Sequence, residues 1–111
     1  MPTLRKLYQG SPTTETTTTP GVYKAPAAGA LVKQISVSNS TGTPCTLTLS
    51  HVTSGGTGGA TNRVISGMTI NPDATHGPTV VDVFWPMVQD DFLTAVLSAT
   101  GSVLSVWGLT L

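Results

Sequence analysis

The residues able to bind a metal are few and scattered along the chain. His51 and His76 lie at the end of an expected strand and in an expected loop, and neither belongs to a metal-ligand spacing such as two histidines four residues apart on a helix. Asp73 and His76 together make too thin a ligand set for a metal. Capping of the loop by Asn71 and Asp73 explains these residues better. We therefore expect no metal site and no cofactor.

Cys45 and the adjacent pair Asp90 and Asp91 are the remaining candidates for catalysis. Cys45 lies within an expected strand among threonines and leucines, a setting typical of a buried structural thiol rather than a nucleophile. Adjacent residues on an extended chain point to opposite faces, so the two aspartates do not form an acid and base pair. They are better interpreted as shaping the turn before the segment DFLTAVLSAT. The sequence predicts no catalytic residue and a protein that is not an enzyme.

The segment SGGTGG, residues 54–59, is the one stretch that resembles a ligand-binding loop. A phosphate-binding loop needs a lysine followed by serine or threonine after its last glycine, and a helix that begins there; this stretch has neither. A linker between domains is also excluded, because the pieces on either side are each too short to fold alone. We expect a long exposed connection between two strands that is free to contact a neighbour.

Charge is scarce and unevenly distributed. Charged residues make up 9% of the 111 residues and the net charge is zero, which removes the attraction that dominates non-specific nucleic-acid binding. A surface so poor in charge is weakly protected from association, so we expect copies of this chain or other chains to cover it. Opposite charges separate along the sequence, which suggests head-to-tail pairing between subunits beside the alternative of ordinary solvated charge. The basic group is Arg5, Lys6, Lys24 and Lys33, and the acidic group is Asp73, Asp82, Asp90 and Asp91.

Two features bear on the compartment. A single cysteine, Cys45, allows no internal disulfide, and no N-terminal stretch has the form of a signal peptide, so we expect synthesis in a reducing cytosol. No apolar run approaches the roughly 20 residues needed to cross a bilayer, so no membrane partner is expected.

Short extended segments broken by Gly, Pro, Asn and Asp predict an all-β fold. In residues 45–51, Cys45, Leu47 and Leu49 alternate with polar residues, which is typical of a half-buried strand. About eight short strands at spacings near a dozen residues favour a single antiparallel β-sandwich or jelly roll. We assign residues 1–26 to an extended N-terminal arm with edge strands and residues 27–111 to the sandwich. The other expected strands are 3–10, 31–39, 62–70, 79–86, 91–100 and 101–111.

The aromatic side chains allow two interpretations. Trp107 alternates with Val103 and Leu109, which predicts a core position, whereas Trp85 next to Pro86 is expected to be the exposed ring. An exposed tryptophan suits a subunit interface. The alternative is a carbohydrate-binding module, in which sugar rings stack on Trp85, Trp107, Tyr8 and Tyr23.

Most of the chain from residue 22 onward resembles a known group of proteins. The residues that carry the resemblance are a Tyr-x-x-Pro segment, the strand VKQISVSN, the strand and glycine loop TLTLSHVTSGGT, the segment NRVISG, and a final hairpin with a Gly turn in DDFLTAVLSATGSVLSVWGLTL. This pattern resembles small structural proteins of tailed bacteriophages. The longer and more aromatic stretch NPDATHGPTVVDVFWPMVQ departs from it, as does the threonine-rich stretch near the start. The resemblance implies a virion protein made in the cytoplasm of a host bacterium.

These observations lead to one expectation of function and two alternatives. We expect a non-enzymatic accessory protein of the virion, associated with the tail, fibre or tail tip, that forms a homo-oligomer such as a trimer or larger ring and binds larger virion proteins. The alternatives are a capsid decoration or cementing protein and a carbohydrate- or receptor-binding module. The N-terminal arm is expected to reach an adjacent chain. The expected interface residues are Trp85, Arg5, Lys6, Tyr8, Asp90 and Asp91.

Overall fold

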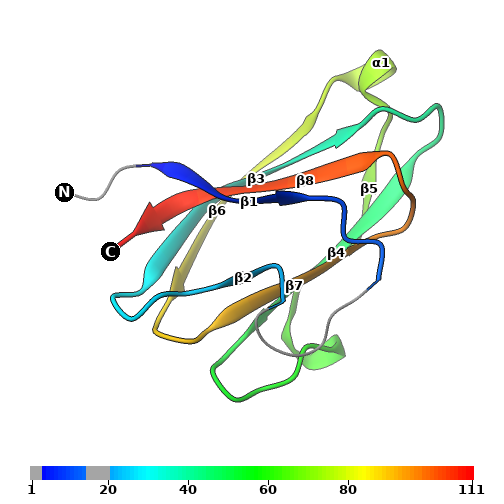
Figure 1. Cartoon of the computed structure of the whole chain (residues 1–111). Helices are drawn as coiled ribbons and strands as arrows, with labels where there is room; N and C mark the ends of the chain where they lie inside the picture. The colour runs from blue at the N-terminus through cyan, green and yellow to red at the C-terminus, as the bar shows by residue number, and fades with distance from the viewer. Residues whose placement is uncertain (1–3, 15–20) are drawn as a thin grey trace.

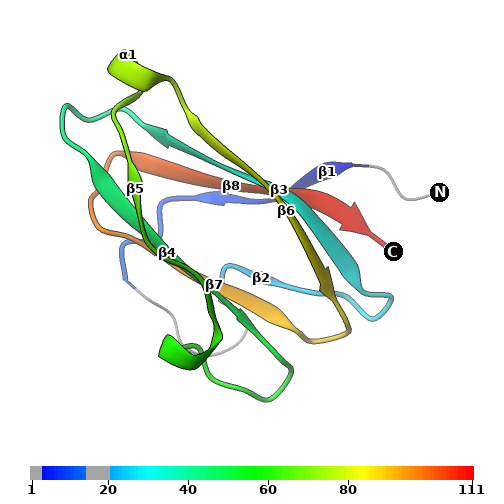
Figure 2. The same cartoon turned by 180° about the vertical axis from the view of Figure 1, so that it is seen from behind.

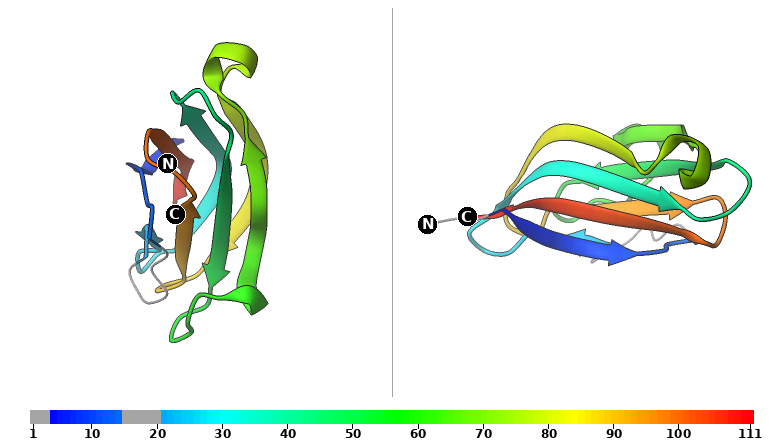
Figure 3. Two further views of the ribbon diagram at one scale, coloured as in Figure 1. Left: turned by 90° about the vertical axis from the view of Figure 1, so that its right-hand side faces the viewer. Right: turned by 90° about the horizontal axis from the view of Figure 1, so that it is seen from above.

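Two four-stranded antiparallel sheets form the computed structural model of the chain, which describes residues 4–14 and 21–111 (Figure 1). The sheets lie against one another as two layers (Figure 3). The all-β sandwich predicted from the sequence is confirmed. The strands are Arg5–Gly10 (β1), Tyr23–Lys24 (β2), Ala30–Asn39 (β3), Cys45–Val52 (β4), Arg63–Ile70 (β5), Thr79–Met87 (β6), Phe92–Leu97 (β7) and Ser102–Thr110 (β8), with short helices at Ala60–Asn62 (η1) and Asp73–His76 (α1).

The strand order is that of a jelly roll. One sheet has the order β1-β8-β3-β6 and the other β2-β7-β4-β5. The pairs β1 with β8, β2 with β7, β3 with β6 and β4 with β5 are therefore nested along the chain and alternate between the two sheets. This is an antiparallel ribbon of four strand pairs wrapped into two layers, which is the double-sheet arrangement of jelly rolls.

The core lies between the sheets and follows the alternation of the strands. Ile35 and Val37 of β3 and Leu47 and Leu49 of β4 are at most 1% exposed, as their alternation with polar residues predicts. Leu93, Ala95 and Leu97 of β7 share this core, which confirms the expected face of that strand. Each sheet thus buries one face against the other.

The predicted face of β8 is wrong. Leu104 and Val106 are buried in the core, whereas Val103, Trp107 and Leu109 lie on the opposite face of the strand. The segment VLSVWGL carries apolar residues at both odd and even positions, so alternation alone does not determine which face of the strand is buried. Pairing with β3 chooses it, because Val106 and Leu104 lie opposite the buried Ile35 and Val37.

The described part of the N-terminal arm belongs to the sandwich of its own chain. β1 pairs with β8 at the edge of one sheet, and β2 pairs with β7 at the edge of the other. Residues 5–10 thus have a strand partner within the chain, and the expected contact of the arm with an adjacent chain stays a prediction. The threonine-rich stretch, residues 15–20, lies outside the described residues.

The glycine loop is the long connection between β4 and β5, as expected. Residues 53–57 are exposed, and the loop lies at the end of the sandwich opposite α1 (Figures 1 and 2). A turn closes where the Gly56 amide donates to the Thr53 carbonyl at 2.9 Å. The Asn62 side chain then accepts from the Gly59 amide at 3.0 Å and donates to the Thr57 carbonyl at 2.9 Å. A backbone turn and the Asn62 side chain thus stabilise the loop.

Candidate interaction surface

The outward side of the β1-β8-β3-β6 sheet exposes large apolar side chains, and we call it the open face. Along β6 the side chains alternate, so that Val81, Val83 and Trp85 pack against the core while Val80 and Phe84 point outward. Phe84 is 62% exposed, and Val88, just beyond the strand, is 70% exposed. Monomeric proteins rarely leave such side chains clustered in water. The open face therefore has the character of a surface that another molecule covers.

A polar row crosses the open face from one edge to the other. Strand register places Lys6 of β1 beside Trp107 of β8, Trp107 beside Gln34 of β3, and Gln34 beside Asp82 of β6. The Gln34 amide donates to an Asp82 carboxylate oxygen at 3.1 Å. The row thus has a cation at the β1 edge and an anion at the β6 edge.

Rows of different character lie on either side of the polar row. Towards one end, Leu109, Leu31 and Pro86 lie side by side on β8, β3 and β6. Towards the other end the row is Gln9, Ser105, Ser36 and Val80. The open face is therefore apolar at one end and largely polar at the other.

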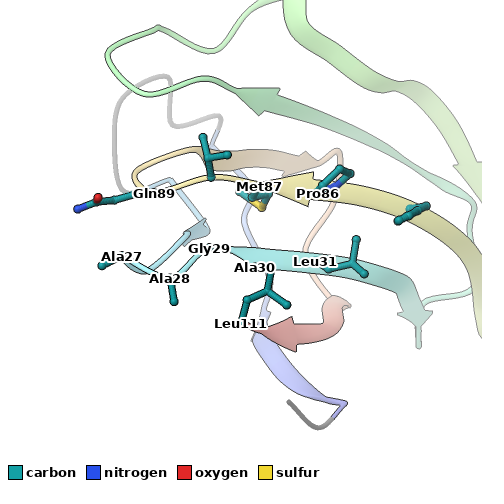
Figure 4. Close-up of a pocket in the computed structure, with 11 residues that line it drawn as sticks. Ala27, Ala28, Gly29, Ala30, Leu31, Pro86, Met87, Gln89 and Leu111 are labelled. Atoms are coloured by element: carbon teal, nitrogen blue, oxygen red, sulfur yellow. The ribbon is translucent and has the colours of Figure 1, made fainter. Parts of the chain in front are cut away.

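An open apolar pocket of about 480 Å³ lies at the apolar end. Its lining includes Leu31 of β3, Pro86 of β6 and Leu111 after β8, together with Ala27 and Ala28 (Figure 4). Beside it, the Lys33 ammonium lies 5.3 Å from the centre of the Phe84 ring, a cation–π contact. Because its lining carries no ionisable side chain, the pocket suits an apolar group of a partner.

The outward side of the other sheet differs, and we call it the covered face. Phe92 of β7 and Val52 of β4 lie opposite one another, are at most 1% exposed, and stand outside the core between the sheets. A side-chain carbon at Gly56 would touch Val52 at 3.0 Å, which shows how closely the glycine loop folds back on this strand. The chain itself covers this sheet where β4 ends and β7 begins.

Of the expected interface residues, Arg5 and Lys6 on β1 are exposed, whereas Tyr8 and Trp85 are partly buried against the core. Trp85 is partly buried against the core, so the expectation that it is the exposed ring is wrong; its neighbour Phe84 has that place because the strand alternates. Lys6 is exposed on the open face and donates to the Gln9 side chain. Tyr8 is partly buried, and burial raises the pKa of its hydroxyl. Arg5 is exposed.

Arg5 lies close enough to Tyr23 of β2 for its charge to act on the tyrosine hydroxyl. Burial raises the pKa of the Tyr23 hydroxyl, and the positive charge of Arg5 nearby opposes this shift. Within the described part of the chain, the buried Tyr23 hydroxyl has no hydrogen-bond partner. Tyr8 and Tyr23 are both partly buried against the core.

Asp90 and Asp91 shape the turn between β6 and β7, as the sequence indicated. Asp90 adopts a positive φ of 69° and pairs with Lys24 of the same chain at 3.5 Å. Asp91 is 5% exposed and accepts from the amides of Ser54 and Val88, each at 3.1 Å. Asp91 therefore ties the glycine loop to the β6–β7 turn and does not face a neighbour.

The residues considered for catalysis or metal binding contact other residues of the fold. Buried Cys45 lies 3.2 Å from the Ser102 hydroxyl, and His51 lies 3.8 Å from the Asp91 carboxylate. Asp73 accepts from the Ser38 hydroxyl at 2.6 Å and from the Asn39 amide at 2.9 Å, and these hydrogen bonds lower the pKa of its carboxyl. Within residues 4–14 and 21–111, no three His, Cys, Asp or Glu side chains gather at a possible metal site.

Comparisons with known proteins do not identify the chain. No protein-family model, curated protein or solved structure matches it. The resemblance to phage structural proteins therefore remains a prediction from the sequence. In the described part of the chain, no helix is long and apolar enough to cross a membrane.

The sequence interpretation missed the open face as a surface. Its expected interface residues included Lys6 but not Phe84, Val80 or Trp107. The signal was present in TVVDVFWP, which carries apolar residues at both parities. A strand that is apolar on both sides has one side to bury in the core and a second to cover by other means.

Proposed function

We propose that this chain is a non-enzymatic structural protein of a tailed-phage virion, an accessory subunit that associates with copies of itself and with larger virion proteins through the open face. The observation that carries the association is the exposure of Phe84, Val80 and Val88 beside an apolar pocket on one sheet. The virion setting is supported by the sequence resemblance alone.

The jelly-roll order is compatible with this role. Jelly rolls occur in viral capsid proteins and in lectins, so the fold alone supports both a structural and a sugar-binding role. The aromatic side chains favour the structural role. Phe84 is the exposed aromatic ring of the described residues, and the Lys33 ammonium occupies a place above it, where a sugar would otherwise stack.

Copy number in purified particles tests the virion setting. We would quantify the protein by mass spectrometry against the major capsid and tail-tube proteins, in intact particles and in separated heads and tails. A few to a few tens of copies that travel with tails would support the tail-accessory role. Hundreds of copies that travel with heads would instead make it a capsid decoration protein, and absence from particles would overturn the proposal.

Attachment of variants tests the open face. Val80 of β6 and Val64 of β5 are exposed valines on edge strands of the two sheets, 55% and 41% exposed respectively. Val80→Asp places a charge on the open face and should lower incorporation into particles about tenfold or more, because an unpaired charge at a contact is costly. Val64→Asp is the matched control and should be incorporated normally. Equal incorporation of the two variants would rule out the open face as the attachment surface.

A further inference from the structure

The charges at the two edges of the open face are placed for self-association. Lys6 lies at the β1 edge and Asp82 at the β6 edge of the same row, with Trp107 and Gln34 between them. A two-fold axis that lies in the contact plane, parallel to the strands and between β8 and β3, would exchange the edges of two sheets packed face to face. It would place Lys6 of each copy over Asp82 of the other.

We infer that the open face binds a second copy of the chain about such an axis. Rotation about an axis parallel to the strands keeps each row at its own level along the strands. Leu109 would then lie over the second copy's Leu31, and Ser105 over its Ser36. On the two central strands leucine meets leucine and serine meets serine, and opposite charges meet at both edges, while Gln9 of each copy would lie over Val80 of the other. Like residues at the centre and opposite charges at the edges give the self-complementarity that a two-fold interface requires.

The open face also has a hollow that fits this arrangement. Beside the polar row is a hollow of about 390 Å³ bordered by Leu4, Lys33, Gln34 and Asp82 among others. The two-fold rotation brings the second copy's Trp107 over Gln34, at this hollow. Tryptophan in a partner's pocket is a common anchor of protein interfaces.

The size of the sheet is adequate for a dimer. The four strands are six to ten residues long, and at about 4.8 Å between strands and about 3.3 Å per residue they make a flat area of roughly 540 Å². Side-chain relief adds to this, which brings the contact near the roughly 800 Å² per partner of stable interfaces. Two sheets packed face to face keep their strands within about 30° of one another, which an axis along the strands permits.

This inference rests on the proposed function, since it names the partner that meets the open face. A second copy is favoured over an unrelated protein because the face carries a cation, Lys6, and an anion, Asp82, at places that the two-fold axis exchanges. The chain has no net charge, so no general repulsion opposes association of two copies.

Charge reversal tests the arrangement in the full chain. We would measure the dimer dissociation constant by sedimentation velocity for the wild type, Lys6→Asp, Asp82→Lys and the double variant. Each single variant sets like charges against one another at two symmetric places and should weaken the dimer about tenfold or more. The double variant restores opposite charges at both places and should return close to the wild-type constant. Lys24→Asp changes the net charge by the same amount as Lys6→Asp but lies on the other sheet, and should have no effect.

The outcomes separate this inference from the proposed function. Rescue in the double variant supports the two-fold arrangement. A wild-type dimer without rescue overturns it, as does a wild-type chain that stays monomeric at the highest soluble concentration. In either of these cases, loss of virion attachment by Val80→Asp but not by Val64→Asp would leave the proposed function standing.

Discussion

The open face and the covered face differ in whether the chain itself covers their large apolar side chains. Both sheets carry large apolar side chains on their outward sides, Phe84 on one and Phe92 on the other. Phe92 is 1% exposed because the chain covers its sheet, whereas Phe84 is 62% exposed. The same residue type in adjacent layers of one fold thus contributes to stability on one face and is available for association on the other.

This difference comes from the loops and not from the strands. The connection between β4 and β5 is long enough to fold back over Val52, and buried Asp91 holds it there through the Ser54 amide. Among residues 4–14 and 21–111, the loop of residues 53–59 has no counterpart over the open face, where β6 is bounded by the short turn before β7. The length of the glycine loop thus lets it fold back over the end of β4.

Replacing each of the two phenylalanines by alanine should give the largest difference between the two faces in the free energy of unfolding. Phe92→Ala leaves a cavity under the loop and should lower the free energy of unfolding by about 3–5 kcal/mol. Phe84→Ala removes an exposed ring and should change it by no more than about 0.5 kcal/mol. Urea unfolding at low protein concentration, where association does not add to stability, measures both. Similar losses in the two variants would mean that the faces do not differ in this way.

Replacement of Asp91 should expose the covered face. Asp91→Ala leaves the amides of Ser54 and Val88 without their acceptor and should cost about 2–3 kcal/mol. Asp90→Asn is the control, because it breaks only the exposed pair with Lys24 and should cost about 0.5 kcal/mol or less. Amide hydrogen exchange in residues 53–57 should accelerate in Asp91→Ala alone. Unchanged exchange there would show that Asp91 does not hold the loop.

The smallest effect is expected at the end of the sandwich, where Asp73 binds the end of β3. Its pKa is below the ordinary value because Ser38 and Asn39 donate to it. A carboxyl with a lowered folded-state pKa stabilises the fold above its unfolded pKa of about 4, and this contribution disappears as the pH falls through the folded-state value. The melting temperature of Asp73→Ala should therefore lie below that of the wild type at neutral pH and converge with it in acid. A constant gap down to pH 2 would contradict this.

The sequence predicted the layers of the fold better than the use of its surfaces. Strands with polar residues at alternate positions, such as residues 45–51, indicated their inner face correctly. β8 and β6 carry apolar residues at both parities, so only pairing with β3 determines which side is buried. This is why alternation predicts the wrong face for Trp107, whereas the wrong expectation for Trp85 comes from its place next to Pro86. Lys6 and Asp82 are 76 positions apart in the sequence, and only the strand order places them in one row.

Hydroxyl-radical footprinting of the protein on intact particles, compared with the dilute isolated chain, tests the open face most directly. The label reacts with exposed aromatic and aliphatic side chains, and both faces offer one: Phe84 on the open face and Val64 on the other sheet. We predict strong protection of Phe84 and Val88 in particles with no change at Val64. Equal labelling of Phe84 in both states, or protection confined to Val64, would contradict the assignment of the open face as the surface of assembly.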